Sequence, residues 1–126
     1  MSNEQPNEEI RNILSQLQKQ ARDISRELSK NRVEFGSKVR EARQCTLTLS
    51  ELSRLSSDDI KFYRPVGKMF MLENRSSIED RIVKKHKLAQ EDSKKLTTKI
   101  KSLEAEVETN QRALKELVRS IDLESV

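Results

Sequence analysis

The 126-residue chain contains only two glycines and two prolines, with three Phe, one Tyr and no Trp. These turn residues are too scarce for a barrel or sandwich of many strands, because each hairpin of such a fold needs them. The 25 basic and 21 acidic residues give a formal net charge of +4. A charged, nearly balanced composition is shared by long helices, coiled coils and disordered chains, so the spacing of apolar residues must distinguish them.

The composition also limits the kinds of site that the chain can hold. It has one cysteine, Cys45, and one histidine, His86. We therefore expect no internal disulfide, no metal site and no cofactor, and no residue pattern predicts a phosphate-binding loop or an enzyme activity. The N-terminus lacks the features of a signal peptide and no apolar run could span a membrane, which favours the cytosol or nucleus.

The first predicted helix covers residues 8–45, where apolar residues alternate at spacings of four and three. Its seam positions are Ile10, Leu14, Leu17, Ala21, Ile24, Leu28, Asn31, Phe35, Lys38, Ala42 and Cys45. This spacing is typical of a coiled-coil helix and not of a strand. Asn7 is expected to cap the helix. A capping-box pattern from Thr48 to Glu51 predicts a separate short helix over residues 49–57.

The second predicted helix covers residues 76–124 and repeats the spacing, after a capping-box pattern that begins at Ser76. Its seam positions are Ile82, His86, Ala89, Ser93, Leu96, Ile100, Leu103, Val107, Asn110, Leu114, Leu117 and Ile121. A helix of this size would be roughly 73 Å long. Its seam needs a partner helix, and the simplest is the first helix folded back antiparallel.

Several unusual seam residues are interpreted structurally. Asn31 and Asn110 are polar residues that would specify the register of the two helices. Cys45 would be a small apolar seam residue. His86 could be a pH switch or a ligand, but no second ligand accompanies it, so a seam residue is the favoured interpretation.

Between the helices, residues 60–73 combine most of the chain's aromatic residues with Val and Met. Pro65 suits the first central position of a type I turn, and Gly67 suits the left-handed position after it, which predicts a β-hairpin. An isolated hairpin is marginally stable, so either partner chains extend its sheet or it caps the coiled coil locally. The expected fold is mainly α: one domain over residues 1–126, a long antiparallel two-helix coiled coil with one β-hairpin inserted at the turnaround.

The order of these elements resembles the prefoldin family. The matching residues are Leu47-Thr48 and Glu51-Leu52 in the first half, followed by Val66-Gly67-Lys68-Met69-Phe70 between the helices. Coiled-coil spacing alone is nonspecific, so the last of these runs carries most of the resemblance. A chain with a single hairpin resembles the β-type subunits of this family, because the α-type subunits carry a second hairpin.

The run from Tyr63 to Leu72 is most similar to the subunit 1 branch of the β-type subunits. Arg64 and Pro65 depart from the small or acidic residues that this branch would carry before Val-Gly. The family resemblance rests on the residues that follow them.

The resemblance implies a heterohexamer of two α-type and four β-type subunits, in which hairpins form a double β-barrel platform that carries the coiled coils. It also implies a cytoplasmic co-chaperone that uses no ATP, holds unfolded actin and tubulin, and delivers them to the cytosolic chaperonin. Subunit assembly is assigned to hairpin residues. These are Phe62, Tyr63, Val66, Gly67, Met69, Phe70, Met71 and Leu72.

The apolar stripe widens where the two chain ends would meet. We define the tip set as Ile10, Ile13, Leu14, Leu17, Leu114, Leu117, Val118 and Ile121. These residues either bind unfolded clients by nonspecific apolar burial or only close the coiled coil, and the pattern leaves both interpretations open.

Two other functions fit parts of the sequence. A structural coiled-coil adaptor would use the hairpin to dock onto a different scaffold. A nucleic-acid-binding helical hairpin is suggested by a basic cluster in the second helix. The cluster contains Lys84, Lys85, Lys87, Lys94, Lys95, Lys99 and Lys101. Acidic residues interrupt it and no aromatic residue lies beside it for base stacking, so a solvated helix face is favoured.

Overall fold

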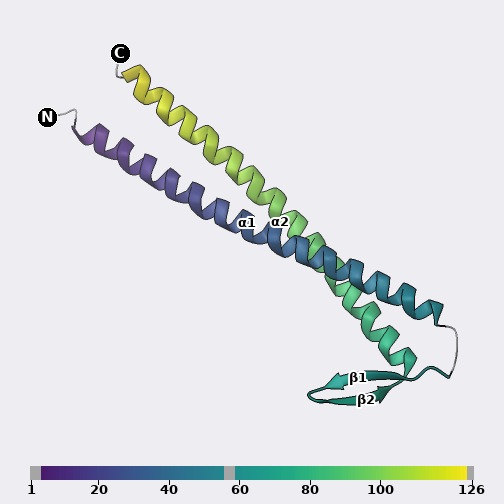
Figure 1. The fold of residues 1–126 in the computed structure, drawn as a ribbon. Helices are drawn as coiled ribbons and strands as arrows, with labels where there is room; N and C mark the ends of the chain where they lie inside the picture. Colours follow the sequence, from purple (N-terminus) through teal and green to yellow (C-terminus); the bar gives the residue numbers. More distant parts are fainter. Residues whose placement is uncertain (1–3, 56–58, 125–126) are drawn as a thin grey trace. The chain divides into compact units, whose positions relative to one another are not determined.

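The computed structural model describes residues 4–55 and 59–124. In chain order these form helix α1 (Glu4–Arg54), strands β1 (Phe62–Val66) and β2 (Met69–Glu73), and helix α2 (Arg75–Glu124) (Figure 1). The predicted mainly α fold, with one hairpin between two long coiled-coil helices, is confirmed. The chain divides into two compact units, Met1–Val33 with Leu96–Val126 and Glu34–Lys95, and each unit contains a segment of both helices.

In the unit Met1–Val33 with Leu96–Val126, a buried polar contact joins the two helix segments. Asn110 on α2 donates from Nδ2 to the backbone oxygen of Leu17 at 3.3 Å and to Oε1 of Gln20 at 3.5 Å, both on α1. Sliding one helix along the other would leave this buried amide unpaired, which is unfavourable. The contact therefore supports the interpretation of Asn110 as a residue that specifies register.

In the unit Glu34–Lys95, the seam is built around three buried residues, Cys45 and Leu52 on α1 and Ala89 on α2. Lys38 also lies at a seam position. Its Nζ is 3.5 Å from a carboxylate oxygen of Asp92 on α2, so the basic side chain bridges the two segments. A charge at the seam is tolerated here because it is paired and only partly removed from water.

The first helix starts earlier than the sequence predicts. It begins at Glu4, so the lower bound of the predicted range 8–45 is wrong and Asn7 is not its N-cap. Pro6 lies in the first turn. A proline is tolerated there because the first backbone N–H groups of a helix have no partner within the helix.

The same helix also ends later than predicted. It continues to Arg54 without a break, so the separate short helix over residues 49–57 is wrong, and residues 56–58 lie outside the described part of the chain. The hydroxyl of Thr48 donates to the backbone oxygen of Gln44 at 2.8 Å. Thr48 is therefore a residue inside a helix, bonded to the preceding turn, and does not cap a new one.

Packing explains why the local capping signal is overridden. The four-three spacing continues from Cys45 through Leu49 to Leu52, and the first and last of these are buried while Leu49 is half-buried. In proteins, helices are stabilised mainly by burial of an apolar face. A helix that keeps its seam to Leu52 has no reason to stop at residue 45.

Helix α2 follows the prediction closely. It begins at Arg75, one residue from the predicted start, and ends at Glu124. The backbone oxygen of Asn74 accepts the N–H of Ile78 at 3.2 Å, which marks Asn74 as the residue at the helix boundary. No helix in the described part of the chain is long and apolar enough to cross a membrane.

Candidate functional site

The two strands form an antiparallel hairpin with a turn of two residues. Phe62 lies opposite Glu73 and Val66 lies opposite Met69, which leaves Gly67 and Lys68 in the turn. Gly67 has a φ of 62°, and no other residue in the described segments has a positive φ. A positive φ at only the first turn residue is the φ pattern of a type II′ turn.

The position of Pro65 corrects the predicted turn. Pro65 lies within β1, opposite Phe70, and does not occupy the first central position of a type I turn. A type I turn would splay the two strands, whereas a primed turn has the right-handed twist of a hairpin. The prediction that Gly67 adopts a left-handed conformation is confirmed.

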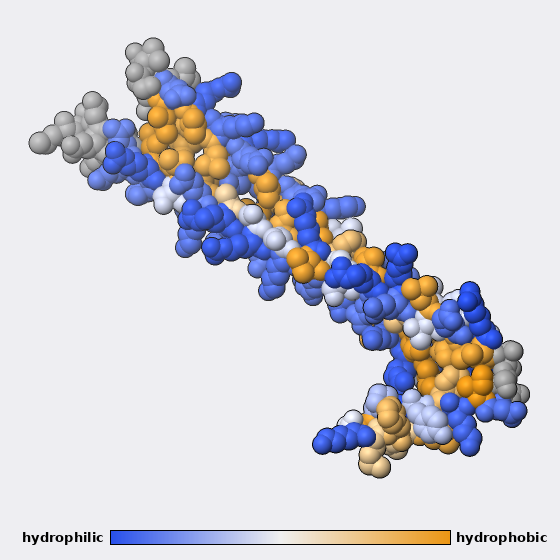
Figure 2. Space-filling model, in the orientation of Figure 1, coloured by the Kyte–Doolittle hydropathy of each residue, from blue (hydrophilic) through white to orange (hydrophobic). Residues whose placement is uncertain are grey.

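Alternation of side chains along the strands gives the hairpin two faces. The free face carries Tyr63, Pro65, Phe70 and Leu72. The anchored face carries Phe62, Arg64, Val66, Met69, Met71 and Glu73. All four residues of the free face are exposed, with Phe70 71% and Leu72 64% accessible. Figure 2 shows apolar surface on the hairpin, and a chain with so much of it uncovered is expected to bind a partner there.

The base of the hairpin is held by Arg75 at the start of α2. The guanidinium carbon of Arg75 lies 5.8 Å from the ring centroid of Phe62, within cation–π range. Its Nε donates to Oε1 of Glu79 at 3.1 Å, and its Nη2 donates to the backbone oxygen of Leu52. One side chain therefore links the end of α1, the first residue of β1 and the first turn of α2.

Glu73 makes a second link between the hairpin and α2. Its Oε1 accepts a hydrogen bond from Nη1 of Arg81 at 2.7 Å, and its side chain is largely buried. The other carboxylate oxygen, Oε2, is buried without a hydrogen-bond partner among the described residues. Because Phe62 and Glu73 share the anchored face, these contacts hold the base of that face to α2, while Met69 and Met71 on the same face stay exposed, as the free face does.

Sequence reasoning missed the anchoring residues Glu73, Arg75 and Arg81. The only visible signal was the spacing of four between Arg75 and Glu79, which predicts a pair on a helix surface and says nothing about the hairpin. The eight predicted assembly residues do lie together on the hairpin. Their role in assembly stays a prediction.

Arg81→Gln is expected to loosen the base of the hairpin. Loss of the guanidinium leaves the carboxylate of Glu73 with a weaker neutral donor, which we expect to destabilise the hairpin by about 1 kcal/mol. Hydrogen exchange of the strand amides is the measurement. Lys84→Gln, on an exposed lysine one turn along α2, is the control for lost charge, and equal exchange rates in the two variants would contradict the anchoring role.

All tip-set residues lie in the unit Met1–Val33 with Leu96–Val126. Six of them are half-buried at seam positions. These are Ile10, Leu14, Leu17, Leu114, Leu117 and Ile121. The other two, Ile13 and Val118, lie beside the seam and are exposed. The structure thus separates two residues that are free to contact another molecule from six that pack in the seam.

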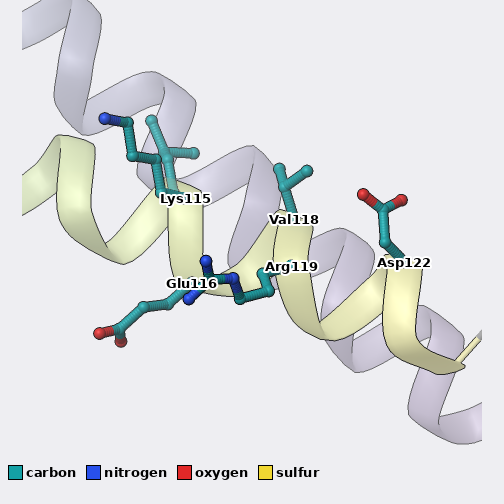
Figure 3. A pocket seen from close by; sticks show the side chains of 6 residues that line it. Lys115, Glu116, Val118, Arg119 and Asp122 are labelled. Atoms are coloured by element: carbon teal, nitrogen blue, oxygen red, sulfur yellow. The ribbon is translucent and has the colours of Figure 1, made fainter.

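The last turns of α2 also form a shallow pocket in this unit. Its lining residues are Leu114, Lys115, Glu116, Val118, Arg119 and Asp122. Figure 3 shows Lys115, Val118 and Asp122 projecting from one side of α2, with Glu116 and Arg119 on another. The exposed Val118 is therefore flanked along the helix by one basic and one acidic residue, Lys115 and Asp122.

The lysines of the basic cluster are all exposed on α2. Nζ of Lys85 lies 3.9 Å from a carboxylate oxygen of Glu41 on α1, in the same unit. Acidic side chains thus lie within reach of the cluster, as expected for a solvated helix face. Within residues 4–55 and 59–124, no three His, Cys, Asp or Glu side chains group as a metal site would require.

In a comparison with known proteins, residues 8–121 of the chain match the family model for prefoldin subunits. The chain is 34% identical over 98 residues to a probable prefoldin subunit 1 of Dictyostelium discoideum, covering 76% of this chain and 83% of that protein. It is 26% identical over 110 residues to prefoldin subunit 1 of both Bos taurus and Homo sapiens, covering 87% of this chain and 89% of each relative. The chain therefore belongs to the prefoldin family of co-chaperone subunits, and its single hairpin and these relatives place it with the β-type subunits.

Proposed function

We propose that this chain is one subunit of a heterohexameric, ATP-independent co-chaperone in the cytoplasm. The complex captures unfolded nascent proteins such as actin and tubulin and delivers them to the cytosolic chaperonin. The hairpin joins the chain to α-type and β-type partner subunits. The tip set supplies part of the surface that holds the unfolded client.

The observation that carries this proposal is the uncovered hairpin. Phe70 and Leu72 on the free face, and Met69 and Met71 on the anchored face, are all large, apolar and exposed in the single chain. Burial of such side chains contributes about 25 cal/mol per Å² of apolar surface. Because the chain belongs to a family of subunits, the other subunits are the partners expected to cover this surface.

Client capture is supported by Ile13 and Val118. Each is about half accessible and lies next to a half-buried seam residue, so a client segment can cover the side chain without unfolding the coiled coil. Apolar burial has no directional requirement, which suits a surface that must accept many unfolded sequences.

Assembly is tested by native mass spectrometry of the chain mixed with α-type and β-type prefoldin subunits. A six-chain complex is the expected result. Co-purification of the chain with an unrelated scaffold, and without other small helical-hairpin chains, would instead indicate the coiled-coil adaptor. Binding to duplex DNA or RNA that weakens steeply with salt would indicate a nucleic-acid-binding protein.

Client capture is tested by the double substitution Ile13→Ser with Val118→Ser. Each change removes an apolar contact of about 1.5 kcal/mol when fully buried, so affinity for a client is expected to fall by about tenfold per side chain. The measurement is light scattering of denatured actin diluted into the assembled hexamer. Stronger scattering with the variant is the expected outcome.

The matched control is Val39→Ser with Val83→Ser. Val39 and Val83 are 44% and 52% accessible, close to the 47% and 48% of Ile13 and Val118, but they belong to the unit Glu34–Lys95. The control is expected to suppress aggregation as the unmodified chain does. Equal losses in both variants, or failure of the tip variant to enter the hexamer, would contradict a client-binding role for the tip set.

A further inference from the structure

A groove follows the seam in the unit Met1–Val33 with Leu96–Val126. Its volume is about 650 Å³, which is within the range of ligand-binding pockets. Leu17 and Ile24 line it from α1, and residues between Ser102 and Ala113 line it from α2. Leu17 is the only member of the tip set that lines the groove, so the groove is distinct from the surface proposed to hold clients.

The α2 side of the groove carries a row of small side chains. These are Ser102, Ala105, Thr109 and Ala113, which recur at spacings of three or four residues and therefore follow one side of the helix. The hydroxyl of Thr109 donates to the backbone oxygen of Ala105 at 3.0 Å, so it is satisfied within α2. The row spans about 16 Å of helix. Side chains this short allow the backbone of another helix to approach α2 closely.

A buried acceptor without a donor lies in the same groove. Asn110 is one of the lining residues and is only 7% accessible. Its Nδ2 donates to Leu17 and Gln20 on α1, but its Oδ1 is buried and accepts no hydrogen bond from the described residues. An unsatisfied buried acceptor is unfavourable. A ligand that brings a donor into the groove would therefore make a hydrogen bond that this amide oxygen lacks in the chain alone.

The charged residues of the groove are all acidic. Asp23 lines it from α1 and Glu106 lines it from α2, and both side chains are exposed. No lysine or arginine is among the lining residues. Complementary charge selects a binding partner and disfavours partners of the same sign. The groove therefore favours a ligand whose flanks are basic.

We propose that this groove binds a basic amphipathic helix of another protein, which completes a local three-helix bundle. The apolar face of the helix covers Leu17, Ile24 and the row of small residues. One polar side chain near its middle donates to Oδ1 of Asn110. Lysines or arginines on its two flanks face Asp23 and Glu106. This binding site goes beyond the proposed function, because its ligand is folded and lies away from the end of the coiled coil.

The backbone of the ligand decides between a helix and an extended segment. The backbone groups of α1 and α2 bond within each helix, so the groove offers a ligand only a few side-chain partners. An extended segment would leave most of its groove-facing N–H and C=O groups unpaired, which is unfavourable. A helix pairs these groups itself and presents only side chains to the groove.

Binding of a synthetic peptide to the full chain tests the proposal. The probe is a fluorescein-labelled helix of about 18 residues, with leucine, alanine and one central glutamine on one face and lysine on the other. Fluorescence anisotropy is expected to show saturable binding with a dissociation constant below about 100 μM. A peptide with glutamate in place of every lysine, and a reordered peptide without an apolar face, are each expected to bind at least about tenfold more weakly.

The acidic residues are tested by Asp23→Asn with Glu106→Gln. Loss of two exposed carboxylates is expected to weaken binding of the lysine peptide by about fivefold. The matched control is Glu8→Gln with Glu108→Gln, which removes two exposed carboxylates from the same two helices outside the groove lining. The control is expected to bind the peptide as the unmodified chain does. Equal weakening in both variants would reduce the effect to net charge and overturn the site.

A bulky side chain gives a second readout that leaves the charge unchanged. Thr109→Phe fills the groove, whereas Gln111→Phe adds the same ring to an exposed position of α2 outside the lining. We expect Thr109→Phe to weaken binding at least about tenfold and Gln111→Phe less than about twofold. Both positions are exposed, so the helical circular dichroism signal is expected to remain that of the unmodified chain. Equal binding by the two variants would contradict the groove as the binding site.

The role of Asn110 is tested from the ligand, which leaves the seam intact. Methionine in place of the central glutamine of the peptide removes the donor at similar length and is expected to weaken binding by about fivefold. Unchanged or tighter binding would contradict the hydrogen bond to Oδ1 of Asn110. Equal binding of the reordered peptide would assign the groove to unfolded segments, and the absence of saturable binding would overturn the proposal. These measurements use the chain alone, so they do not depend on its entry into a hexamer.

Discussion

Gly67→Val is expected to reduce incorporation of the chain into the hexamer by about 5- to 150-fold, because a φ of 62° is strained for a β-branched residue by about 1–3 kcal/mol. A Cβ atom at this position would meet no other atom within 4 Å, so crowding is not the cause. The cost lies in the backbone conformation of the turn. If the turn opens, the register that presents the free face is lost.

The neighbouring turn residue provides the control. Lys68→Val adds the same side chain at the other position of the turn, where φ is not positive, and is expected to assemble nearly normally. Gly67→Asn should fall between the two, since asparagine tolerates left-handed conformations better than valine does. Competition against the unmodified chain, read by native mass spectrometry, is the measurement. Equal incorporation of Gly67→Val and Lys68→Val would contradict the turn argument.

Leu96→Ala is expected to lower the free energy of unfolding of the chain by about 2–3 kcal/mol. Leu96 is only 5% accessible and occupies a seam position on α2. The value lies at the lower end for buried leucines, because water reaches the seam of two helices more easily than the core of a globular domain. Urea unfolding followed by the helical circular dichroism signal measures the change.

Leu88→Ala is the matched control for this prediction. Leu88 lies on the same helix, eight residues before Leu96, and is 60% accessible. The same truncation there removes little buried surface and is expected to change stability by less than about 0.5 kcal/mol. If both variants lost the same stability, helix propensity and not seam burial would explain the effect, and the assigned seam would be wrong.

The seams were predictable because they depend on a periodicity that is repeated many times. Ala89 and Leu96, and the two polar residues Asn31 and Asn110, were assigned to the seam from spacing alone and are all buried. A single exception hardly disturbs such a pattern. The mainly α fold with one inserted hairpin follows from it together with the position of the few turn residues.

The boundaries within α1 and the turn of the hairpin were not predictable from local motifs. The pattern from Thr48 to Glu51 is that of a helix start, but seam burial around Leu52 continues the helix through it. Pro65 suits a turn, yet the twist of paired strands selects a turn at Gly67 and Lys68. In the helix the packing of the seam, and in the hairpin the pairing of the two neighbouring strands, outweighs the preference of a few residues.

The candidate site was likewise predictable only in part. The sequence located the apolar hairpin by its composition and the widened stripe of the tip set by its spacing. How the base of the hairpin is attached to α2 depends on Arg75 over Phe62 and on Arg81 with Glu73. These contacts join residues of different elements, and their geometry cannot be read from the spacing of charges in one sequence.

The seam contains few buried apolar side chains. Among the described residues these are Cys45, Leu52, Ala89 and Leu96, and none of them is completely buried. A chain that gains so little from its own interior depends on its partners for stability, and bound partners at 100 times their dissociation constant add about 2.7 kcal/mol. Its lifetime in a cell should therefore follow the supply of the other subunits: copies made in excess would be degraded, which keeps the amounts of the assembling chains in proportion.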